Sequence, residues 1–168
     1  MKKTLLCILF SIFLIACSGV KNTQQAISAG NYNKAIAVSV ENLKKNKFKK
    51  GNQPHIILLE DAYAKAVKRD LSKIDFLKKD NNPQNLERIY NLYQNLDARQ
   101  ELIKPLLPLN ILKKERTARF SFNNYDDKII KAKDKLTTYL YDNAKKLLKS
   151  SNKFDARTAY DDLAYIEK

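Results

Sequence analysis

Cysteine is scarce in this sequence, and its scarcity excludes several kinds of chemistry. The 168 residues contain two cysteines, Cys7 and Cys17, and both lie within the first 17 positions. The rest of the chain therefore has no thiol for a disulfide, a zinc site or nucleophilic catalysis. Histidine is equally scarce, since His55 is the only one. A single imidazole cannot anchor zinc, and beside Pro54 at a helix start we expect His55 to be a surface cap rather than a base.

Glycine and proline are also few, and runs typical of β-strands are missing. The chain has three glycines and four prolines. Glycine-rich phosphate loops are absent, which removes the usual signature of nucleotide binding. Apolar residues recur with a helical rather than an alternating period, so the composition and the pattern together predict an all-α fold.

Carboxylates occur as neighbours in the sequence, which is the wrong spacing for catalysis. The three pairs are Glu60-Asp61, Asp126-Asp127 and Asp161-Asp162. Adjacent side chains on a helix diverge by about 100°, so no such pair presents two carboxylates to one substrate. We therefore expect no catalytic residues, no metal ligands, no cofactor and no small-molecule substrate, and we expect that the protein is not an enzyme.

The most specific pattern lies at the N-terminus. Lys2 and Lys3 precede an apolar run over residues 5–16 that only Ser11 interrupts. This run is too short to span a bilayer, which takes about 20 residues, and its charged start and small final residue are typical of a secretory signal peptide. Its end, Leu14-Ile15-Ala16-Cys17, resembles the lipobox of bacterial lipoproteins.

The resemblance implies a lipid anchor and a location. In that family the cysteine thiol is alkylated with diacylglycerol, a peptidase cuts before it, and the new amino group is often acylated, so Cys17 would be the lipidated mature N-terminus. Two or more acyl chains anchor a protein stably. Ser18 rather than Asp follows, and no acidic cluster comes next, which by analogy favours the periplasmic face of an outer membrane. An ordinary signal peptide with a chance cysteine, or an uncleaved anchor, are the alternatives.

The balance of charge is strongly basic. The net charge is +14, and loss of Lys2 and Lys3 with the signal peptide leaves +12. Basic residues are spread along the chain, and no arginine cluster with interleaved aromatics is present, so nucleic acid is not an expected partner. Two interpretations stay open: a solvated basic surface without a ligand, or affinity for anionic lipid headgroups, lipopolysaccharide or cell-wall polymer.

The apolar periodicity predicts one helical domain over residues 23–168, after a signal peptide over 1–16 and a tether over 17–22. Two long helices joined by a short connector are expected to form an antiparallel hairpin. Residues 119–122 alternate but have no partner strand, so we expect an irregular segment that packs two phenylalanines. The helices are expected over residues 23–29, 32–46, 54–79, 83–105, 126–149 and 154–167.

Two turns resemble each other. Residues 26–35 align with residues 148–157, and each contains a helix end, a polar turn, an aromatic and small residues. The pattern resembles the helix-turn-helix of tetratricopeptide repeats, in a degenerate form without the 34-residue period. The matching residues are Gly30, Tyr32 and Ala35 in the first copy and Asn152, Phe154 and Ala159 in the second. The alternative is an irregular helical bundle.

These patterns together predict a lipid-anchored protein of the cell envelope. We expect a non-enzymatic helical adaptor or binding module on the periplasmic side, with a protein partner in the envelope. The alternative function is the binding of anionic envelope polymers, cell wall or lipopolysaccharide, through the basic surface. Cys17 is the only residue to which the sequence assigns a chemical role.

Overall fold

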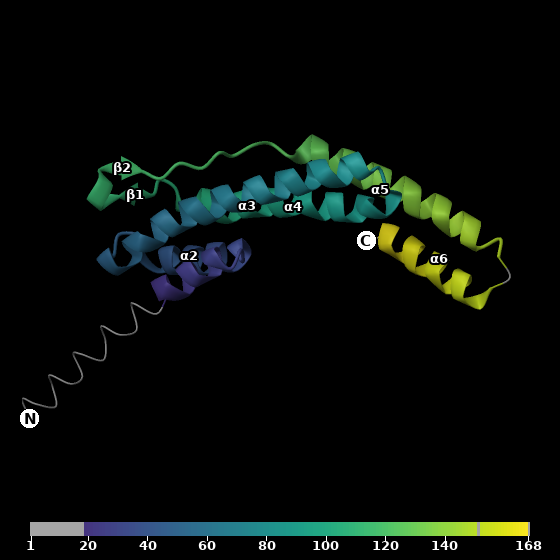
Figure 1. Ribbon diagram of the computed structural model, residues 1–168, viewed down its shortest axis with the longest axis horizontal. Helices are drawn as coiled ribbons and strands as arrows, with labels where there is room; N and C mark the ends of the chain where they lie inside the picture. Colours follow the sequence, from purple (N-terminus) through teal and green to yellow (C-terminus); the bar gives the residue numbers. More distant parts are fainter. Residues whose placement is uncertain (1–18, 151, 168) are drawn as a thin grey trace, which may run out of the picture. The chain divides into compact units, whose positions relative to one another are not determined.

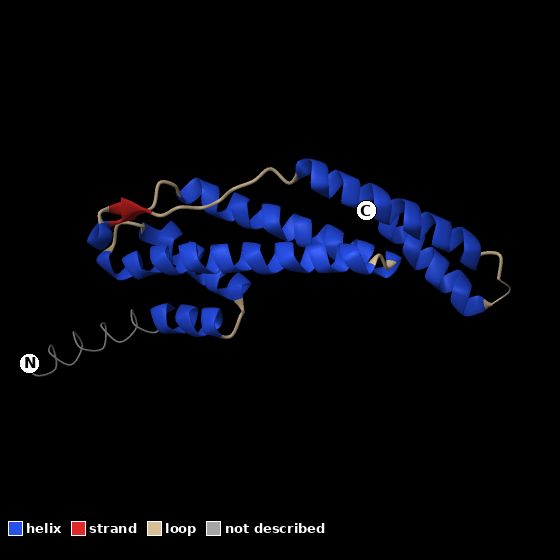
Figure 2. Cartoon of the chain, turned by 45° about the horizontal axis from the view of Figure 1, so that its top comes forward, coloured by secondary structure: helices blue, strands red, loops and turns tan. Residues whose placement is uncertain are grey.

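The structure is a computed structural model, which describes residues 19–150 and 152–167. Helices account for most of the described chain, and its strands are two residues long (Figures 1 and 2). The predicted all-α class is confirmed. The signal peptide, Cys17 and the first part of the expected tether lie outside the described residues.

The chain divides into two compact units. Unit 1 comprises the described residues up to Asp70 together with Ala98–Asn123. Unit 2 comprises Leu71–Asp97 and the described residues from Asn124 onward. The helices α3 (Gln53–Asp80) and α4 (Leu86–Ile103) contribute residues to both units.

Unit 1 begins with a helical segment over residues 19–28, so residues 19–22 of the expected tether are helical. Gly30 follows this helical segment and has a φ of +73°, the left-handed conformation that glycine adopts without steric cost. The chain turns there and returns as the next helix. Asn31 then caps α2 (Tyr32–Asn46), because its side-chain Oδ1 accepts a hydrogen bond from Lys34 N. The bounds predicted for this second helix are confirmed.

The long helices start and stop close to the predicted places. A short 3-10 turn, η1 (Lys50–Asn52), leads into α3, and a second, η2 (Pro83–Asn85), leads into α4. Asn82 caps η2, since its Oδ1 accepts from Gln84 N, and proline occupies the first position. Pro105 ends the helical path within η3 (Lys104–Leu106).

An extended segment follows α4 and returns along it. The strands β1 (Asn110–Ile111) and β2 (Arg116–Thr117) pair antiparallel around η4 (Leu112–Lys114), a small hairpin that the periodicity did not predict. Residues 118–124, here called the strap, are irregular as expected. Phe120 and Phe122 each pack edge-on against Tyr63, with ring centroids 5.6 and 5.7 Å away.

The core of unit 1 lies between the first two helical segments, α3 and the strap. Ile36 and Leu43 of α2 and Ile56 and Leu59 of α3 are nearly inaccessible to solvent, and all belong to one contiguous cluster. Leu106 and Leu109 belong to the connector that follows α4, residues 104–109, and join the same cluster, whereas Leu107 between them is exposed. Burial of this apolar surface is the main force that holds the first hairpin onto α3.

Unit 2 adds α5 (Asp126–Leu147) and α6 (Lys153–Ile166), which pack against each other. Small buried residues let the two helices approach, since Ala144 and Ala159 have no exposed surface. Asn152 caps α6 by accepting from Phe154 N, and Asn143 Nδ2 donates to Asp162 across the helix pair at 2.8 Å.

The two turns that resemble each other differ in their surroundings. Tyr32 is half-buried and packs against the core of unit 1. Phe154, its counterpart, is 81% exposed. The aligned aromatics therefore contribute differently to packing, although Ala35 and Ala159 are both fully buried.

Candidate binding surfaces

The described chain starts beside His55. A Cβ built on Gly19 would stand 3.7 Å from His55 Nε2, in the first turn of α3. Cys17, the predicted lipidation site, precedes Gly19 by two residues and lies outside the described part of the chain.

The expectation that His55 is a surface cap is wrong. Its side chain is only 2% exposed, because the helical segment at residues 19–28 covers the start of α3. Burial lowers the pKa of His55 and favours the neutral imidazole. Within the described residues, its Nδ1 has no hydrogen-bond partner.

Glu60 and Asp61 diverge as their adjacency predicts. Arg116 donates two hydrogen bonds to Glu60, from Nη1 to Oε1 at 2.8 Å and from Nη2 to Oε2 at 2.6 Å. Arg119 N donates a third at 2.8 Å, and the Arg116 guanidinium holds the pKa of Glu60 below its usual range. Asp61 instead pairs with Lys65 at 2.8 Å. Glu60 therefore fastens the small hairpin to α3 and is not free for catalysis.

Gln100 holds the strap, a role that the sequence reasoning missed. Asn123 N donates to Gln100 Oε1 at 2.7 Å, and Gln100 Nε2 donates to Asn123 O at 2.9 Å. The side-chain amide thus pairs with the strap as a neighbouring strand would. Gln100 is 1% exposed. The available signal was its place in the apolar rhythm of α4, between Leu96 and Ile103.

A buried ion pair joins α3 and α4 within unit 1. Arg99 Nη2 donates to Asp70 Oδ2 at 2.5 Å, and the two side chains are 6% and 1% exposed. Arg69 Nε donates to the other oxygen of Asp70 at 2.7 Å. Asp70 lies on the buried face of α3, whereas its neighbour Leu71 is half-buried.

The same two arginines hold the turn before α2 and the first residues of α2. Arg99 Nε donates to Asn33 Oδ1 at 2.9 Å, and Arg69 Nη1 donates to Gly30 O at 3.3 Å. The Arg69 guanidinium also stands 5.2 Å from the centroid of the Tyr32 ring. The turn that resembles a tetratricopeptide repeat is therefore fixed by charges from α3 and α4 as well as by packing.

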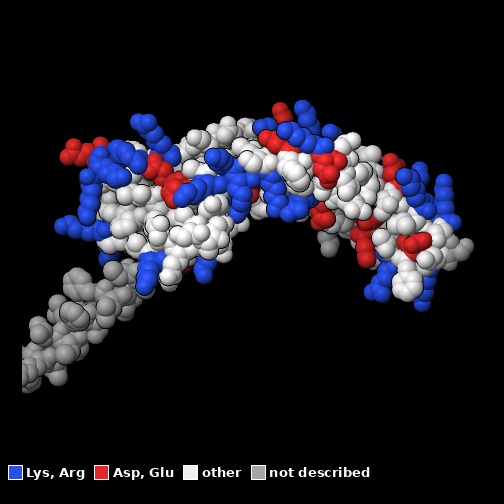
Figure 3. Space-filling view, in the orientation of Figure 1, with Lys and Arg blue, Asp and Glu red and all other residues white. Residues whose placement is uncertain are grey.

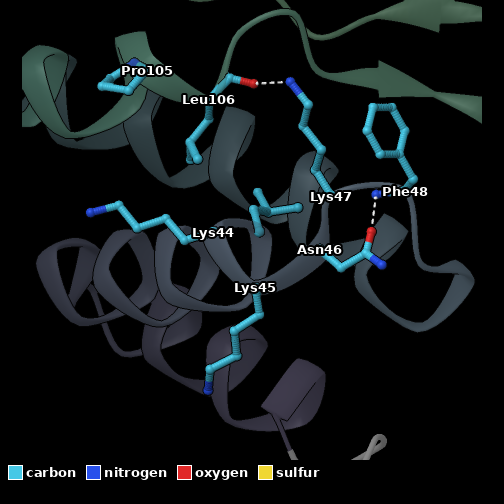
Figure 4. Close-up of a pocket in the computed structure, with 8 residues that line it drawn as sticks. Lys44, Lys45, Asn46, Lys47, Phe48, Pro105 and Leu106 are labelled. Atoms are coloured by element: carbon cyan, nitrogen blue, oxygen red, sulfur yellow. Dashed lines mark hydrogen bonds between the residues drawn. The ribbon is translucent and has the colours of Figure 1, made fainter.

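Lysines that look scattered in the sequence gather on one end of unit 1. Five lie in residues 44–53 and three in residues 104–114, and neither segment contains Asp or Glu. Lys47 Nζ joins the segments by donating to Leu106 O at 2.8 Å and Pro108 O at 3.2 Å, beside a shallow pocket of about 440 Å³ (Figure 4). We call these two segments the lysine-rich end (Figure 3).

Large apolar side chains are exposed on both units. On the lysine-rich end, Phe48 is 71% and Leu112 57% exposed. In unit 2 they include Phe76 of α3, at 69%, and a larger set on α5, on α6 and in the turn between them. That set is Ile130 at 57%, Tyr141 at 51%, Leu148 at 57%, Phe154 at 81%, Tyr160 at 71% and Tyr165 at 39%. Exposed aromatic and apolar side chains in such a group are typical of surfaces that bind other molecules.

The remaining carboxylate pairs do not converge on a site. Asp126, Asp127 and Asp161 are exposed, and Asp162 accepts from Asn143. Across residues 19–150 and 152–167, no group of three or more His, Cys, Asp or Glu side chains could hold a metal ion. None of the helices in the described residues is both long and apolar enough to cross a membrane.

These features define an all-α protein of packed helix pairs, whose buried polar groups hold its own elements together. The chain matches no known protein family, and no curated protein or solved structure is significantly similar to it.

Proposed function

We propose that this protein is a lipid-anchored component of the cell envelope that acts as a helical adaptor on the periplasmic side. Leu14-Ile15-Ala16-Cys17 supports the anchor, with Cys17 as the lipidated residue. The adaptor role is carried by the exposed apolar side chains of α5 and α6, above all Phe154 and Tyr160. Such aromatics are enriched where proteins bind one another. The tetratricopeptide-like turns support the same role, since repeats of that class bind proteins.

The anchor is tested by Cys17→Ala in the full-length protein. Without the thiol no diacylglycerol can be attached, and we expect the protein to leave the membrane fraction while remaining folded. Ser18→Ala is the matched control, because it changes a neighbouring small residue and keeps the lipobox. Wild-type protein that incorporates no more radiolabelled fatty acid than the Cys17→Ala protein would refute the lipid anchor.

The adaptor role is tested by crosslinking in intact cells. A photoreactive amino acid at position 160 is expected to capture a defined envelope protein, and Phe154→Ala is expected to reduce the yield several-fold. Position 34, exposed on α2 of unit 1, serves as the comparison. Equal crosslinking patterns at positions 34 and 160, unaffected by Phe154→Ala, would contradict a protein-binding surface on α6.

The alternative function is binding of an anionic envelope polymer. The lysine-rich end favours it, because its two segments contain eight lysines and no acidic residue. Such binding would weaken steeply with salt, since the Debye length falls from about 10 Å at 0.1 M to about 3 Å at 1 M. Sedimentation with purified cell wall or lipopolysaccharide that is absent, or unchanged by salt, would exclude this alternative.

A further inference from the structure

The lysine-rich end has a composition suited to the surface of a bilayer. Seven of its eight lysines are exposed, while Lys47 is half-buried and bonded to the connector. Leu112 N donates to Gln53 Oε1 at 3.0 Å, which fixes the second segment against the first. Two of the exposed lysines pair with a glutamate just outside the segments, Lys45 with Glu41 and Lys104 with Glu101. The remaining positive charges of both segments act together on one surface.

Apolar side chains stand among these lysines. Phe48 is 71%, Leu112 57% and Leu107 37% exposed. Lys47 Nζ lies 5.6 Å from the centroid of the Phe48 ring. Apolar side chains that enter the headgroup region, flanked by lysines that bind lipid phosphates, are the usual arrangement of interfacial membrane-binding segments. A polar polymer has no apolar region that could bury the exposed side chains of Phe48 and Leu112.

The start of the described chain lies at this same end of unit 1. Gly19 stands against His55. His55 follows Asn52, the last residue of η1, by three residues, so Gly19 lies close to the first segment of the lysine-rich end. Figure 1 shows the start of the segment 19–28 at the end of unit 1 that carries β1, β2 and the last turn of α2. Cys17 is two residues from Gly19, and two residues span at most about 7 Å. A lipid attached at Cys17 would therefore bring lipid headgroups to this end of unit 1.

We propose that the lysine-rich end docks on the anionic phospholipid headgroups of the bilayer in which Cys17 is anchored. Phe48 and Leu112 enter the interface, and the exposed lysines bind phosphate. This proposal rests on the lipid anchor of the proposed function and adds an orientation of unit 1 on the membrane. Each lysine near an anionic surface is expected to increase membrane partition roughly fivefold.

The test uses the lipidated full-length protein and single cysteines. The signal peptide removes Cys7 and the lipid blocks Cys17, so a thiol-reactive fluorophore is expected to label only an introduced residue. Lys49→Cys places the probe on the lysine-rich end. Lys34→Cys is the matched control, because it removes one exposed lysine from the first turn of α2, at the other end of that helix. Carbonate washing of the unlabelled protein first establishes that the anchor is in place.

The labelled proteins are then compared in vesicles with and without phosphatidylglycerol. With phosphatidylglycerol, we expect the probe at position 49 to shift to the blue and to be quenched several-fold more by spin-labelled lipid than the probe at position 34. In 1 M salt, or without phosphatidylglycerol, that difference is expected to disappear. The triple variant Lys44→Gln, Lys45→Gln, Lys50→Gln with the probe at 49 should reduce it as well.

Each other result counts against docking. Equal quenching at both positions, with the protein retained after carbonate, would overturn the docking and leave the anchor intact. A probe at 49 that responds to lipopolysaccharide but not to phosphatidylglycerol would overturn the phospholipid surface in favour of the polymer. Release of the unlabelled protein by carbonate would overturn both the anchor and the docking.

Discussion

At the scale of single residues, Gln100 is the clearest example of a polar side chain that replaces a missing strand. It satisfies both backbone groups of Asn123, with bonds of 2.7 and 2.9 Å. Removing one partner of a buried hydrogen bond costs about 1–3 kcal/mol, because the other partner is left unsatisfied. We expect Gln100→Ala to lower the free energy of unfolding by about that amount and to speed hydrogen exchange at Asn123 N.

Urea denaturation and exchange measured by mass spectrometry check this prediction. Gln94→Ala is the control, because Gln94 lies on the same helix but is exposed and bonds only to Tyr90. If both variants lost the same stability, the clamp on the strap would contribute nothing measurable.

A second prediction at the residue scale concerns His55 and the dependence of stability on pH. Burial lowers its pKa, so the imidazole is neutral in the folded chain, while the unfolded chain binds a proton below about pH 6.5. Below that pH the unfolded state holds more protons, and the free energy of unfolding decreases by up to about 1.4 kcal/mol per pH unit. We expect this decrease between pH 7 and pH 5.5, and we expect His55→Gln to flatten it.

The variant Glu60→Gln distinguishes the loss of stability caused by His55 from a loss caused by protonation of carboxylates. The pKa of Glu60 is lowered by Arg116, so its contribution is complete above about pH 4.3 and is lost only as pH falls through the lowered value. The slope between pH 7 and pH 5.5 should therefore survive in Glu60→Gln, measured by urea titration at each pH. A wild-type protein without any slope in this window would show that His55 is not buried as a neutral group.

At the scale of elements, charge as well as packing determines how α3 and α4 meet within unit 1. Breaking a buried ion pair by removing one partner typically costs about 3–5 kcal/mol, since a buried charge loses its partner. We expect Asp70→Asn to destabilise by about that amount and Arg99→Met by less, because Asp70 keeps its hydrogen bond from Arg69. The double variant is expected to cost clearly less than the sum. A thermodynamic cycle from urea denaturation measures this coupling, and additive effects would contradict it. Lys65→Ala, which breaks an exposed pair, should change stability little.

The turn between the first helical segment and α2 depends on one backbone conformation. Gly30 has a φ of +73°, where any other residue is strained by about 1–2 kcal/mol. Gly30→Ala should reduce stability by about that amount, although nothing lies within 4 Å of the added Cβ. Gly51→Ala is the control, because Gly51 has the same open surroundings without a positive φ. Thermal unfolding compares the two, and equal midpoints would contradict the strain.

At the scale of the whole molecule, we expect the proposed anchor and the fold to be independent. Cys17 lies outside the described residues, and no other cysteine follows it. We expect the Cys17→Ala protein to keep the helical circular-dichroism spectrum and unfolding midpoint of the wild type in detergent. Reductant should leave both unchanged, because the mature chain has no disulfide to reduce. A shift of the midpoint with reductant would refute the assignment of Cys17 as the blocked, lipid-bearing thiol.

The sequence by itself determined the helices, and it predicted a chemical role for Cys17. Helix bounds follow from local periodicity, caps and breakers, so the predicted second helix is confirmed at Tyr32 and Asn46. The absence of an alternating pattern likewise predicted the all-α class. The role of Cys17 rests on a linear pattern and stays a prediction, since Cys17 lies outside the described residues.

Only the tertiary structure decided which polar residues are buried and which lysines act together. Asp70, Arg99 and Gln100 look like interruptions of an apolar pattern, because their partners lie on other elements and no local rule names them. The lysine-rich end depends on a bond between Lys47 and Leu106, 59 residues apart. Periodicity is a property of neighbours in the chain, whereas charge complementarity and surface composition depend on how the helices cross.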